Sequence, residues 1–283
     1  MGKKIIPTSL KEALVALNNS ECYIVAGGSD IMLQKKNTAG LLPKFDKDVL
    51  FIANLDELHY IKKEKDGIHI GATITLEEIL KNDLTPNVLK ECLKELASSN
   101  IRHFATLPGN VANASPAGDT IVVEMMMDAL VKLTSINGSR LVKVEDFVKG
   151  VRKTELAKNE LIEEIIIPNC VYDTCVWYKV GSRKAESISK VMFAGGYTLK
   201  GNKIEKISIA LGSVFIKAVR SHEIENEIEQ LTLDQLKLRV EEFVDKYSNV
   251  IAPIDDQRST KEYRYEVARN IVRKFLLDLV ERR

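Results

Sequence analysis

A pair of consecutive glycines stands where a predicted strand ends, in the segment Ala26-Gly27-Gly28-Ser29-Asp30. The apolar run 23–26 that leads into it is typical of a buried strand. A strand that runs into two glycines exposes backbone N–H groups and lets the main chain approach a diphosphate closely. A simple Gly-Gly turn between a strand and a helix is the alternative. The segment by itself is therefore only a weak indication of phosphate binding.

A second segment, residues 105–119, reads ATLPGNVANASPAGD and shows little periodicity. It carries hydrogen-bonding side chains at Thr106, Asn110, Asn113 and Ser115 between small residues. An irregular loop with many small donors and acceptors suits a polar ligand, and a long surface turn is the alternative. The chain has neither a G-x-G-x-x-G after a strand nor a G-x-x-x-x-G-K-[ST], so the common dinucleotide and P-loop signatures are absent.

Cysteine and histidine are few, and neither residue type shows the spacing of a metal site. No C-x-x-C pair occurs, so we expect neither an iron–sulfur cluster nor a structural zinc ion in this chain. We expect plain thiols at all the cysteines and no metal-ligating histidines, which excludes a metal hydrolase. The residues concerned are Cys22, Cys92, Cys170, Cys175, His59, His69, His103 and His222.

Length and composition predict a soluble protein of two domains, because 283 residues exceed one core of typical size. The 41 Lys and Arg residues balance 40 Asp and Glu residues, so neither nucleic acid nor an anionic membrane is expected as a partner. Apolar stretches fall short of the roughly 20 residues that span a bilayer. The N-terminus lacks the apolar core of a signal peptide. We therefore expect a cytoplasmic protein.

Local patterns predict the elements of the first domain. Ser9 and Thr75, each with a glutamate three residues on, are typical helix caps. Asn137-Gly138 between two apolar runs predicts a hairpin. The β-branched run 161–167 predicts a strand that Pro168 closes.

The segment 169–174 has no clear pattern and is the expected domain boundary. Three antiparallel strands are expected beyond it, over 175–180, 190–199 and 203–211. Helices follow, and Ser259 is expected to open the last one. We expect that helix to bury one face, formed by Tyr263, Val267, Ile271, Phe275 and Leu279.

Four stretches, taken together, resemble the FAD-binding subunits of molybdenum hydroxylases. That family includes the medium subunit of carbon monoxide dehydrogenase and the flavin domain of xanthine dehydrogenase. The stretches occur in order over nearly the whole chain, and the third is the most specific. They are AGGSD (26–30), GATITLEEI (71–79), RHFATLPGNVANASPAGD (102–119) and PIDDQRSTKEYRYEVA (253–268).

The resemblance implies a set of FAD-binding residues. The glycine segment would line the diphosphate, and the middle segment would complete the cradle and support the ribityl chain. These residues are Ala26, Gly27, Gly28, Ser29, Asp30 and Ile31, then Thr106, Gly109, Asn110 and Asn113.

Four further positions match family residues elsewhere on the cofactor. Asp119 would bond ribityl or ribose hydroxyls, and Ile162 would lie near the adenine. Lys179 would reach the flavin ring, and Ile188 would lie over the isoalloxazine. One departure is Pro108, which stands where the family usually has glycine and removes one backbone donor.

The resemblance also implies an α+β fold: an FAD-binding domain over 1–170, with subdomains of about 1–55 and 56–170, and a smaller C-terminal domain over 171–283. FAD, bound non-covalently, would pass electrons from iron–sulfur clusters to NAD or another acceptor. The clusters and the molybdenum cofactor would belong to two partner subunits. Two alternatives are a stand-alone FAD-dependent oxidoreductase of the same fold and an accessory protein that has lost the flavin.

Overall fold

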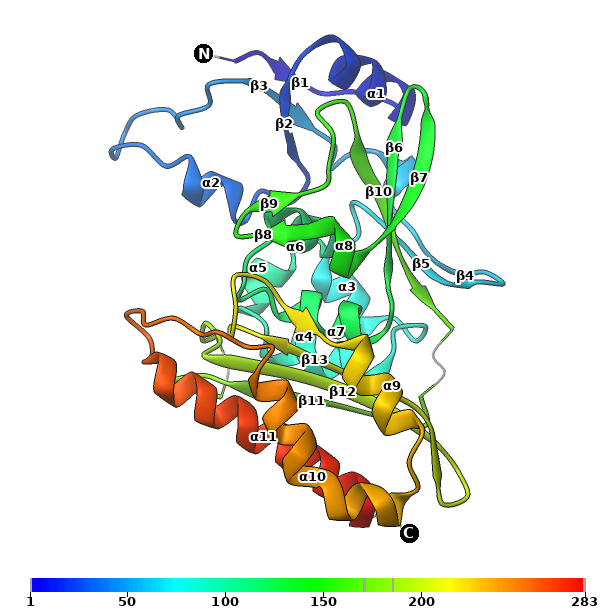
Figure 1. The fold of residues 1–283 in the computed structure, drawn as a ribbon. Coiled ribbons are helices and arrows are strands. Elements are labelled where there is room, and N and C mark those ends of the chain that lie inside the picture. Colours follow the sequence, from blue (N-terminus) through cyan, green and yellow to red (C-terminus); the bar gives the residue numbers. More distant parts are fainter. Residues whose placement is uncertain (1, 170–171, 185, 282–283) are drawn as a thin grey trace.

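The computed structural model describes residues 2–169, 172–184 and 186–281. The N-terminal part holds a small parallel sheet in the order β1-β3-β2, with helices beside it (Figure 1). Ser9 caps the first helix by accepting from the Glu12 amide, as predicted. The elements are β1 Lys4–Ile5, α1 Leu10–Asn19, β2 Cys22–Val25, α2 Ile31–Gln34 and β3 Asp48–Phe51.

A five-stranded antiparallel sheet follows, in the order β4-β5-β10-β6-β7. The predicted hairpin is confirmed: Ser135 pairs with Gly138, which takes a φ of +123°. The strands are β4 Ile61–Lys63, β5 Gly67–Gly71, β6 Leu130–Ser135, β7 Gly138–Lys143 and β10 Leu161–Pro168; a short ribbon pairs β8 Val148–Gly150 with β9 Lys153–Thr154.

The stretch 100–119, expected to be an irregular loop, contains short helices instead. Ser98 and Thr106 cap two of them through their hydroxyls. Helices of this length are too short to show periodicity in a sequence, so their caps were the only available signal. The helices of this region are η1 Asp56–Leu58, α3 Leu76–Lys81, α4 Asn87–Glu95, α5 Ser99–Arg102, α6 Leu107–Asn113, α7 Asp119–Met126 and α8 Val144–Phe147.

The C-terminal sheet has four antiparallel strands rather than the expected three, in the order β11-β12-β13-β14. The extra strand, β14, is only two residues long, and so short a strand leaves no alternation in the sequence. The α+β class is confirmed. The strands are β11 Thr174–Val180, β12 Val191–Lys200, β13 Lys203–Gly212 and β14 Val219–Arg220.

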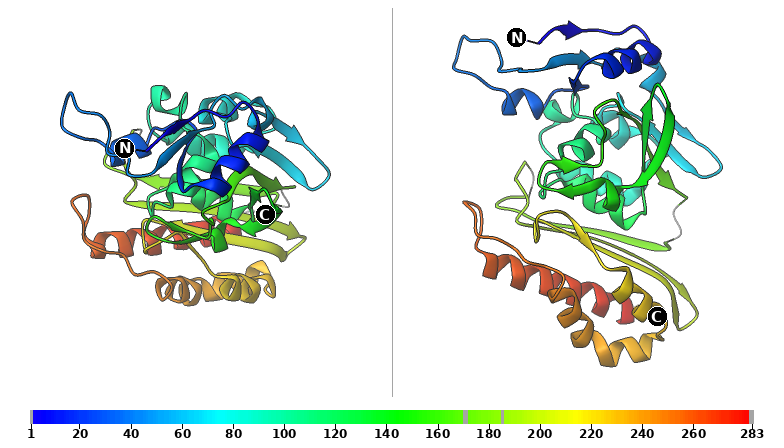
Figure 2. Two further views of the ribbon diagram at one scale, coloured as in Figure 1. Left: turned by 90° about the horizontal axis from the view of Figure 1, so that it is seen from above. Right: turned by 45° about the horizontal axis from the view of Figure 1, so that its top comes forward.

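Both faces of this sheet are buried, because it lies between the C-terminal helices and helices of the first part of the chain (Figure 2). Alternate residues of β12 serve different cores: Met192 and Ala194 pack with α7, whereas Val191 and Phe193 pack with the C-terminal helices. The near-continuous apolar run of β12 follows from this double burial.

Three helices complete the chain: α9 His222–Glu229, α10 Leu233–Ser248 and α11 Lys261–Glu281. The cap of α11 is Thr260, whose hydroxyl accepts from the Tyr263 amide, and not Ser259 as predicted. The buried face of α11 also differs in part, since Tyr263 is exposed while Phe275 and Leu279 are buried. Its other buried positions are Arg264, Ala268, Val272 and Leu276.

Glu124 on α7 is a fully buried acid whose carboxylate oxygens have no partner among the described residues. Burial raises the pKa of Glu124 well above its ordinary value. The folded protein therefore retains a proton that the unfolded chain loses above about pH 4.5, so stability falls as the pH rises toward the folded-state pKa.

We expect Glu124→Gln to remove this part of the pH dependence. Urea unfolding near pH 5 and at about pH 8 should show a smaller loss of stability with rising pH in the variant than in the parent protein. The exposed Glu223→Gln serves as the control. If the Glu124 variant and its parent lost the same free energy of unfolding between the two pH values, Glu124 would not be the group that titrates.

Candidate functional site

The turn between β2 and α2 is built from glycines that no other residue could replace without rearrangement. Gly28 takes a φ of +68°, in the left-handed region that favours glycine. A Cβ on Gly27 would lie 1.6 Å from the carbonyl oxygen of Phe104. The first predicted segment is therefore in direct backbone contact with the start of the second.

The same turn presents consecutive backbone donors. Within the described part of the chain, the amides of residues 27–31 donate to no protein acceptor. Successive unpaired N–H groups around a left-handed glycine form a concave anion site. These residues fit the diphosphate of a dinucleotide cofactor, and their contact with one stays a prediction.

Helix α6 lies beside this turn and carries the other predicted cradle residues. Thr106 is its buried N-cap and accepts from the Gly109 amide at 3.1 Å. The Leu76 amide donates to the Ala105 carbonyl at 2.8 Å, so the stretch 71–79 supports the start of α6. Pro108 occupies the first turn of α6, where a helix makes no use of the N–H itself. The departure at Pro108 thus leaves the helix intact.

A side-chain bridge joins the two segments. Gln34 Nε2 donates to a carboxylate oxygen of Asp30 and, at 2.9 Å, to Asn113 Oδ1. Asn110 faces α7, where its Oδ1 accepts from the Thr120 hydroxyl at 3.0 Å. Gln34 was not predicted; its place one turn after Asp30 on the same helix was the available signal.

Asp119 and Lys179, predicted from widely separated stretches, form a buried ion pair. Lys179 Nζ lies 2.6 Å from Asp119 Oδ2, and their side chains are only 3% and 7% exposed. Ser189 donates to Asp119 Oδ1 at 2.6 Å, and Lys179 also donates to the Glu95 carbonyl. Burial raises the pKa of Asp119, while Lys179 and Ser189 oppose the shift.

An acidic residue at the start of a helix often caps it, and the geometry around Asp119 excludes that role. The N-cap of α7 is Gly118, with no side-chain cap bond, so Asp119 does not cap the helix. Each carboxylate oxygen has a protein donor and keeps a second lone pair. Ser189 was missed in the sequence, because it lies in the segment 181–190 that has no pattern.

The two predicted apolar residues are placed differently. Ile188 is 53% exposed and immediately precedes Ser189, so its backbone is next to the Asp119 cluster. Ile162 is buried in the core of the five-stranded sheet. The structure therefore joins the glycine turn, α6, Asp119, Lys179 and the 188–189 segment, and the roles of Ile162 and Ile188 toward the cofactor stay predictions.

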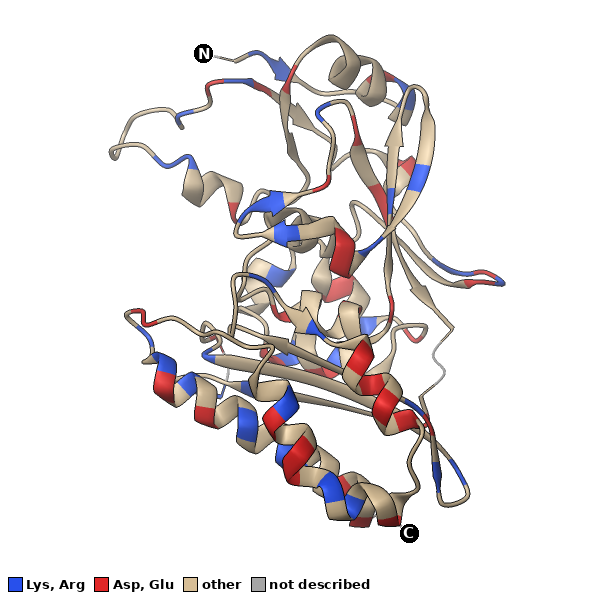
Figure 3. Ribbon diagram, in the orientation of Figure 1, with Lys and Arg blue, Asp and Glu red and all other residues tan. Residues whose placement is uncertain are grey.

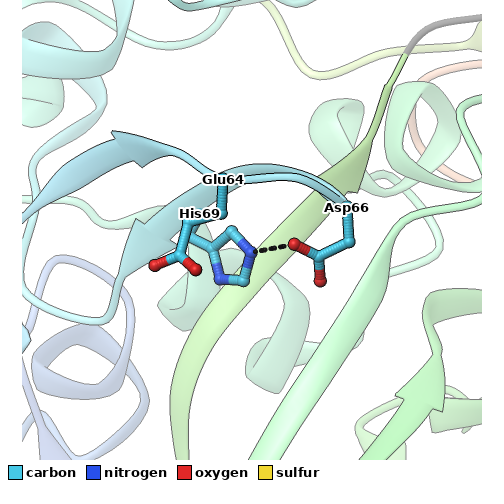
Figure 4. A group of neighbouring side chains, drawn as sticks. All are labelled: Glu64, Asp66 and His69. Atoms are coloured by element: carbon cyan, nitrogen blue, oxygen red, sulfur yellow. Dashed lines mark hydrogen bonds and ion pairs between the residues drawn. The ribbon is translucent and has the colours of Figure 1, made fainter.

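A separate group on the β4–β5 hairpin, Glu64, Asp66 and His69, could hold a metal ion (Figure 4). Its polar atoms already have partners, since Asp66 and the buried Glu164 bond the two nitrogens of His69 at 3.0 Å. Although burial lowers the pKa of His69, these hydrogen bonds raise it overall. Glu64 pairs with Lys62. An ion-pair network on the hairpin accounts for this group, and we infer no metal from it.

Basic and acidic residues are interspersed along the ribbon in Figure 3, and acidic residues gather on α9, at Glu223, Glu225, Glu227 and Glu229. Among the described residues, no helix is both long and apolar enough to cross a bilayer.

Cys92 is buried and Cys22 half-buried, both as thiols, whereas Cys170 lies outside the described residues.

Solved structures of other proteins share this fold over nearly the whole chain. The chain superposes on a Cu,Mo-containing CO dehydrogenase with a TM-score of 0.85 and 24% identity, covering 96% of this chain and 95% of that one. It superposes on quinoline 2-oxidoreductase from Pseudomonas putida with a TM-score of 0.84 and 21% identity, covering 99% and 97%. At these identities the match establishes the fold.

Sequence comparison identifies the family. Residues 2–170 match the FAD binding domain in molybdopterin dehydrogenase, and 177–279 match the CO dehydrogenase flavoprotein C-terminal domain. The glyceraldehyde dehydrogenase medium chain of Sulfolobus acidocaldarius is 34% identical over 94% of both chains. The nicotinate dehydrogenase FAD-subunit of Eubacterium barkeri is 31% identical over 69% of this chain and 67% of that protein.

The chain therefore belongs to the FAD-binding subunits of molybdopterin dehydrogenases, and the resemblance drawn from the sequence is confirmed. It is the flavoprotein subunit of a molybdenum-dependent dehydrogenase, and hence an oxidoreductase component.

Proposed function

We propose that the chain binds one FAD non-covalently and passes electrons through it from iron–sulfur clusters to NAD or another acceptor. The observation that carries the proposal is the glycine turn with its unpaired amides, bridged through Gln34 to α6. Residues 1–170 form the FAD-binding domain, with subdomains of about 1–55 and 56–170, and residues 171–283 form the C-terminal domain.

Each group of site residues has a distinct task in this proposal. The amides of 27–31 bind the diphosphate, and Thr106, Gly109 and Asn110 fix the facing wall. Asp119 accepts from cofactor hydroxyls with its remaining lone pairs, while Lys179 places a positive charge beside it. Bound FAD supplies the redox chemistry of its isoalloxazine, and the protein orients it.

Two partner subunits are expected, because this chain lacks the residues that would hold iron–sulfur clusters or a molybdenum cofactor. Its four cysteines have no cluster spacing, so the iron–sulfur clusters belong to one partner and the molybdenum cofactor to another. Support comes from relatives described as the medium chain of glyceraldehyde dehydrogenase and the FAD-subunit of nicotinate dehydrogenase.

The first test concerns how the flavin is held. Neither 26–31 nor 105–119 contains a His or Cys that could form a covalent flavin link. Acid precipitation of the purified or FAD-reconstituted chain should therefore release all of the yellow chromophore into the supernatant, where it behaves as FAD and not FMN. Colour that stays with the pellet would contradict non-covalent binding, and a chain that cannot be reconstituted would contradict FAD binding itself.

The second test concerns the path of the electrons. The isolated, FAD-loaded chain should reduce a dye slowly with NADH, because the flavin alone can exchange electrons with both. It should not oxidise a purine, aldehyde or N-heterocycle until the iron–sulfur and molybdenum subunits are added. Turnover of such a substrate by the single chain, free of molybdenum, would instead favour the stand-alone oxidoreductase.

A further inference from the structure

Arg264, in the first turns of α11, is a buried cation that binds main-chain carbonyls of two different segments. Its side chain is 4% exposed. One terminal nitrogen donates to the Lys190 carbonyl at 2.5 Å and to the Ser213 carbonyl at 3.1 Å. The other donates to Asp256 Oδ1 at 2.8 Å. A planar guanidinium can hold such partners in a fixed relation, whereas an ammonium acts as a point charge.

The two carbonyls mark matching ends of neighbouring strands. Lys190 immediately precedes β12 and Ser213 immediately follows β13, and Met192 pairs with Gly212 in the antiparallel register. Arg264 therefore fixes the edge at which both strands reach the proposed flavin site.

Ser213 connects Arg264 to two further segments of the chain. It takes a φ of +61°, a conformation that costs a non-glycine residue free energy and needs support from its surroundings. Its amide donates to the Pro116 carbonyl at 3.0 Å, and its hydroxyl donates to the Ser189 carbonyl at 3.2 Å. Ser213 thus contacts both segments that converge on Asp119.

One of those segments joins Asp119 through the backbone and the other through a side-chain hydrogen bond. Pro116 lies in the turn that leads into α7, whose first residue is Asp119. Ser189 donates its hydroxyl to Asp119 Oδ1 at 2.6 Å. A continuous set of hydrogen bonds therefore runs from Arg264 through Ser213 to Ser189 and to the turn before Asp119.

We propose that Arg264 is a positioning residue for the FAD site: by clamping the Lys190 and Ser213 carbonyls, it sets where the Ser189 hydroxyl holds Asp119. The inference rests on the proposed FAD binding. Arg264 touches no cofactor atom in this proposal and acts through Ser213 and Ser189.

The experiment is a double-mutant cycle on FAD affinity in the full chain. We compare the parent, Arg264→Lys, Ser189→Ala and the double variant by flavin fluorescence titration, with thermal unfolding of the FAD-free proteins beside it. We expect each single change to raise the Kd roughly tenfold, and Arg264→Lys to add less than about threefold in the Ser189→Ala background. If Arg264→Lys only damaged the structure, it would raise the Kd for FAD by the same factor in the parent and in the Ser189→Ala variant.

Two further variants keep the result interpretable. Arg273→Lys lies on the same helix and alters an exposed pair with Glu241, so it should leave the FAD Kd unchanged. Ser213→Gly removes the hydroxymethyl group, and with it the bond to the Ser189 carbonyl, and glycine suits the positive φ. It should therefore fold normally and weaken FAD binding about threefold, even if Arg264→Lys does not fold.

The outcomes separate the two proposals. A parent chain that binds no FAD would overturn the proposed function. A parent that binds FAD, together with Arg264→Lys and Ser213→Gly variants of unchanged Kd, would overturn the positioning role alone. An Arg264 effect of equal size with and without the Ser189 hydroxyl would also overturn it.

Discussion

Replacing Asp119 with alanine is expected to destabilise the protein by about 3–5 kcal/mol, because it leaves the buried Lys179 ammonium without its counter-charge. The same change should raise the Kd for FAD at least roughly tenfold, because a hydrogen bond to a charged group contributes about 1.5–3 kcal/mol. Chemical unfolding of the FAD-free chain and fluorescence titration with FAD measure the two effects separately.

Two matched variants identify the causes of the lost stability and of the lost FAD affinity. Asp119→Asn keeps an acceptor for Ser189 but removes the charge, so its FAD affinity should lie between those of the parent and the alanine variant. The double change Asp119→Ala with Lys179→Met removes both charges and should recover much of the stability, but not the FAD affinity. Equal FAD affinity in the parent, Asn and Ala proteins would contradict a role for Asp119 at the cofactor.

Replacing Arg220 with methionine is expected to cost about 3–5 kcal/mol of stability, since its partner Glu225 would be left buried without its counter-charge. The Arg220 side chain is 4% exposed and bonds both carboxylate oxygens of Glu225, at 2.9 and 3.0 Å. It also donates at 2.7 Å to the Met125 carbonyl and to Asp128, at the end of α7. Arg220 therefore ties β14 and α9 to the helix that carries Asp119.

The control for Arg220 is Arg239→Met. Arg239 makes an equally short, two-point ion pair with Glu242, but on the exposed face of α10. Exposed pairs contribute about 0–1 kcal/mol, so the control should unfold close to the parent. Similar urea midpoints for the Arg220 and Arg239 variants would show that burial does not determine how much these ion pairs contribute to stability.

Several parts of the fold could be predicted from local sequence because local interactions produce them. The caps at Ser9 and Thr75 are hydrogen bonds within one helical turn, and the Asn137-Gly138 hairpin joins adjacent strands. The consecutive glycines at 27 and 28 are also visible in the local sequence, but only as a weak indication of phosphate binding, since a simple turn is the alternative.

Long-range burial was harder to predict, and α11 shows why. Its periodic apolar residues indicated a buried face that included Tyr263, yet that residue is exposed and the neighbouring Arg264 is buried. A hydrophobic period cannot reveal a buried arginine, because its charge is accommodated by Asp256 and by carbonyls at the ends of β12 and β13, which only the fold brings together. The two-residue strand β14 was missed for a related reason, since only its pairing with β13 defines it.

The sequence by itself determined the family, because the four matching stretches depend on residue types at fixed local spacing. Through that resemblance it also gave the α+β class and the two segments proposed to form the cofactor cradle. Only the tertiary structure decided that Gln34 bridges to Asn113, 79 positions away, and that Asp119 meets Lys179 and Ser189, 60 and 70 positions away. The contacts of Asp119 arise from the packing of the C-terminal sheet on α7, and the Gln34 bridge arises from the packing of α2 beside α6. Packing of distant elements depends on shape and burial, which leave no periodic signal along the chain.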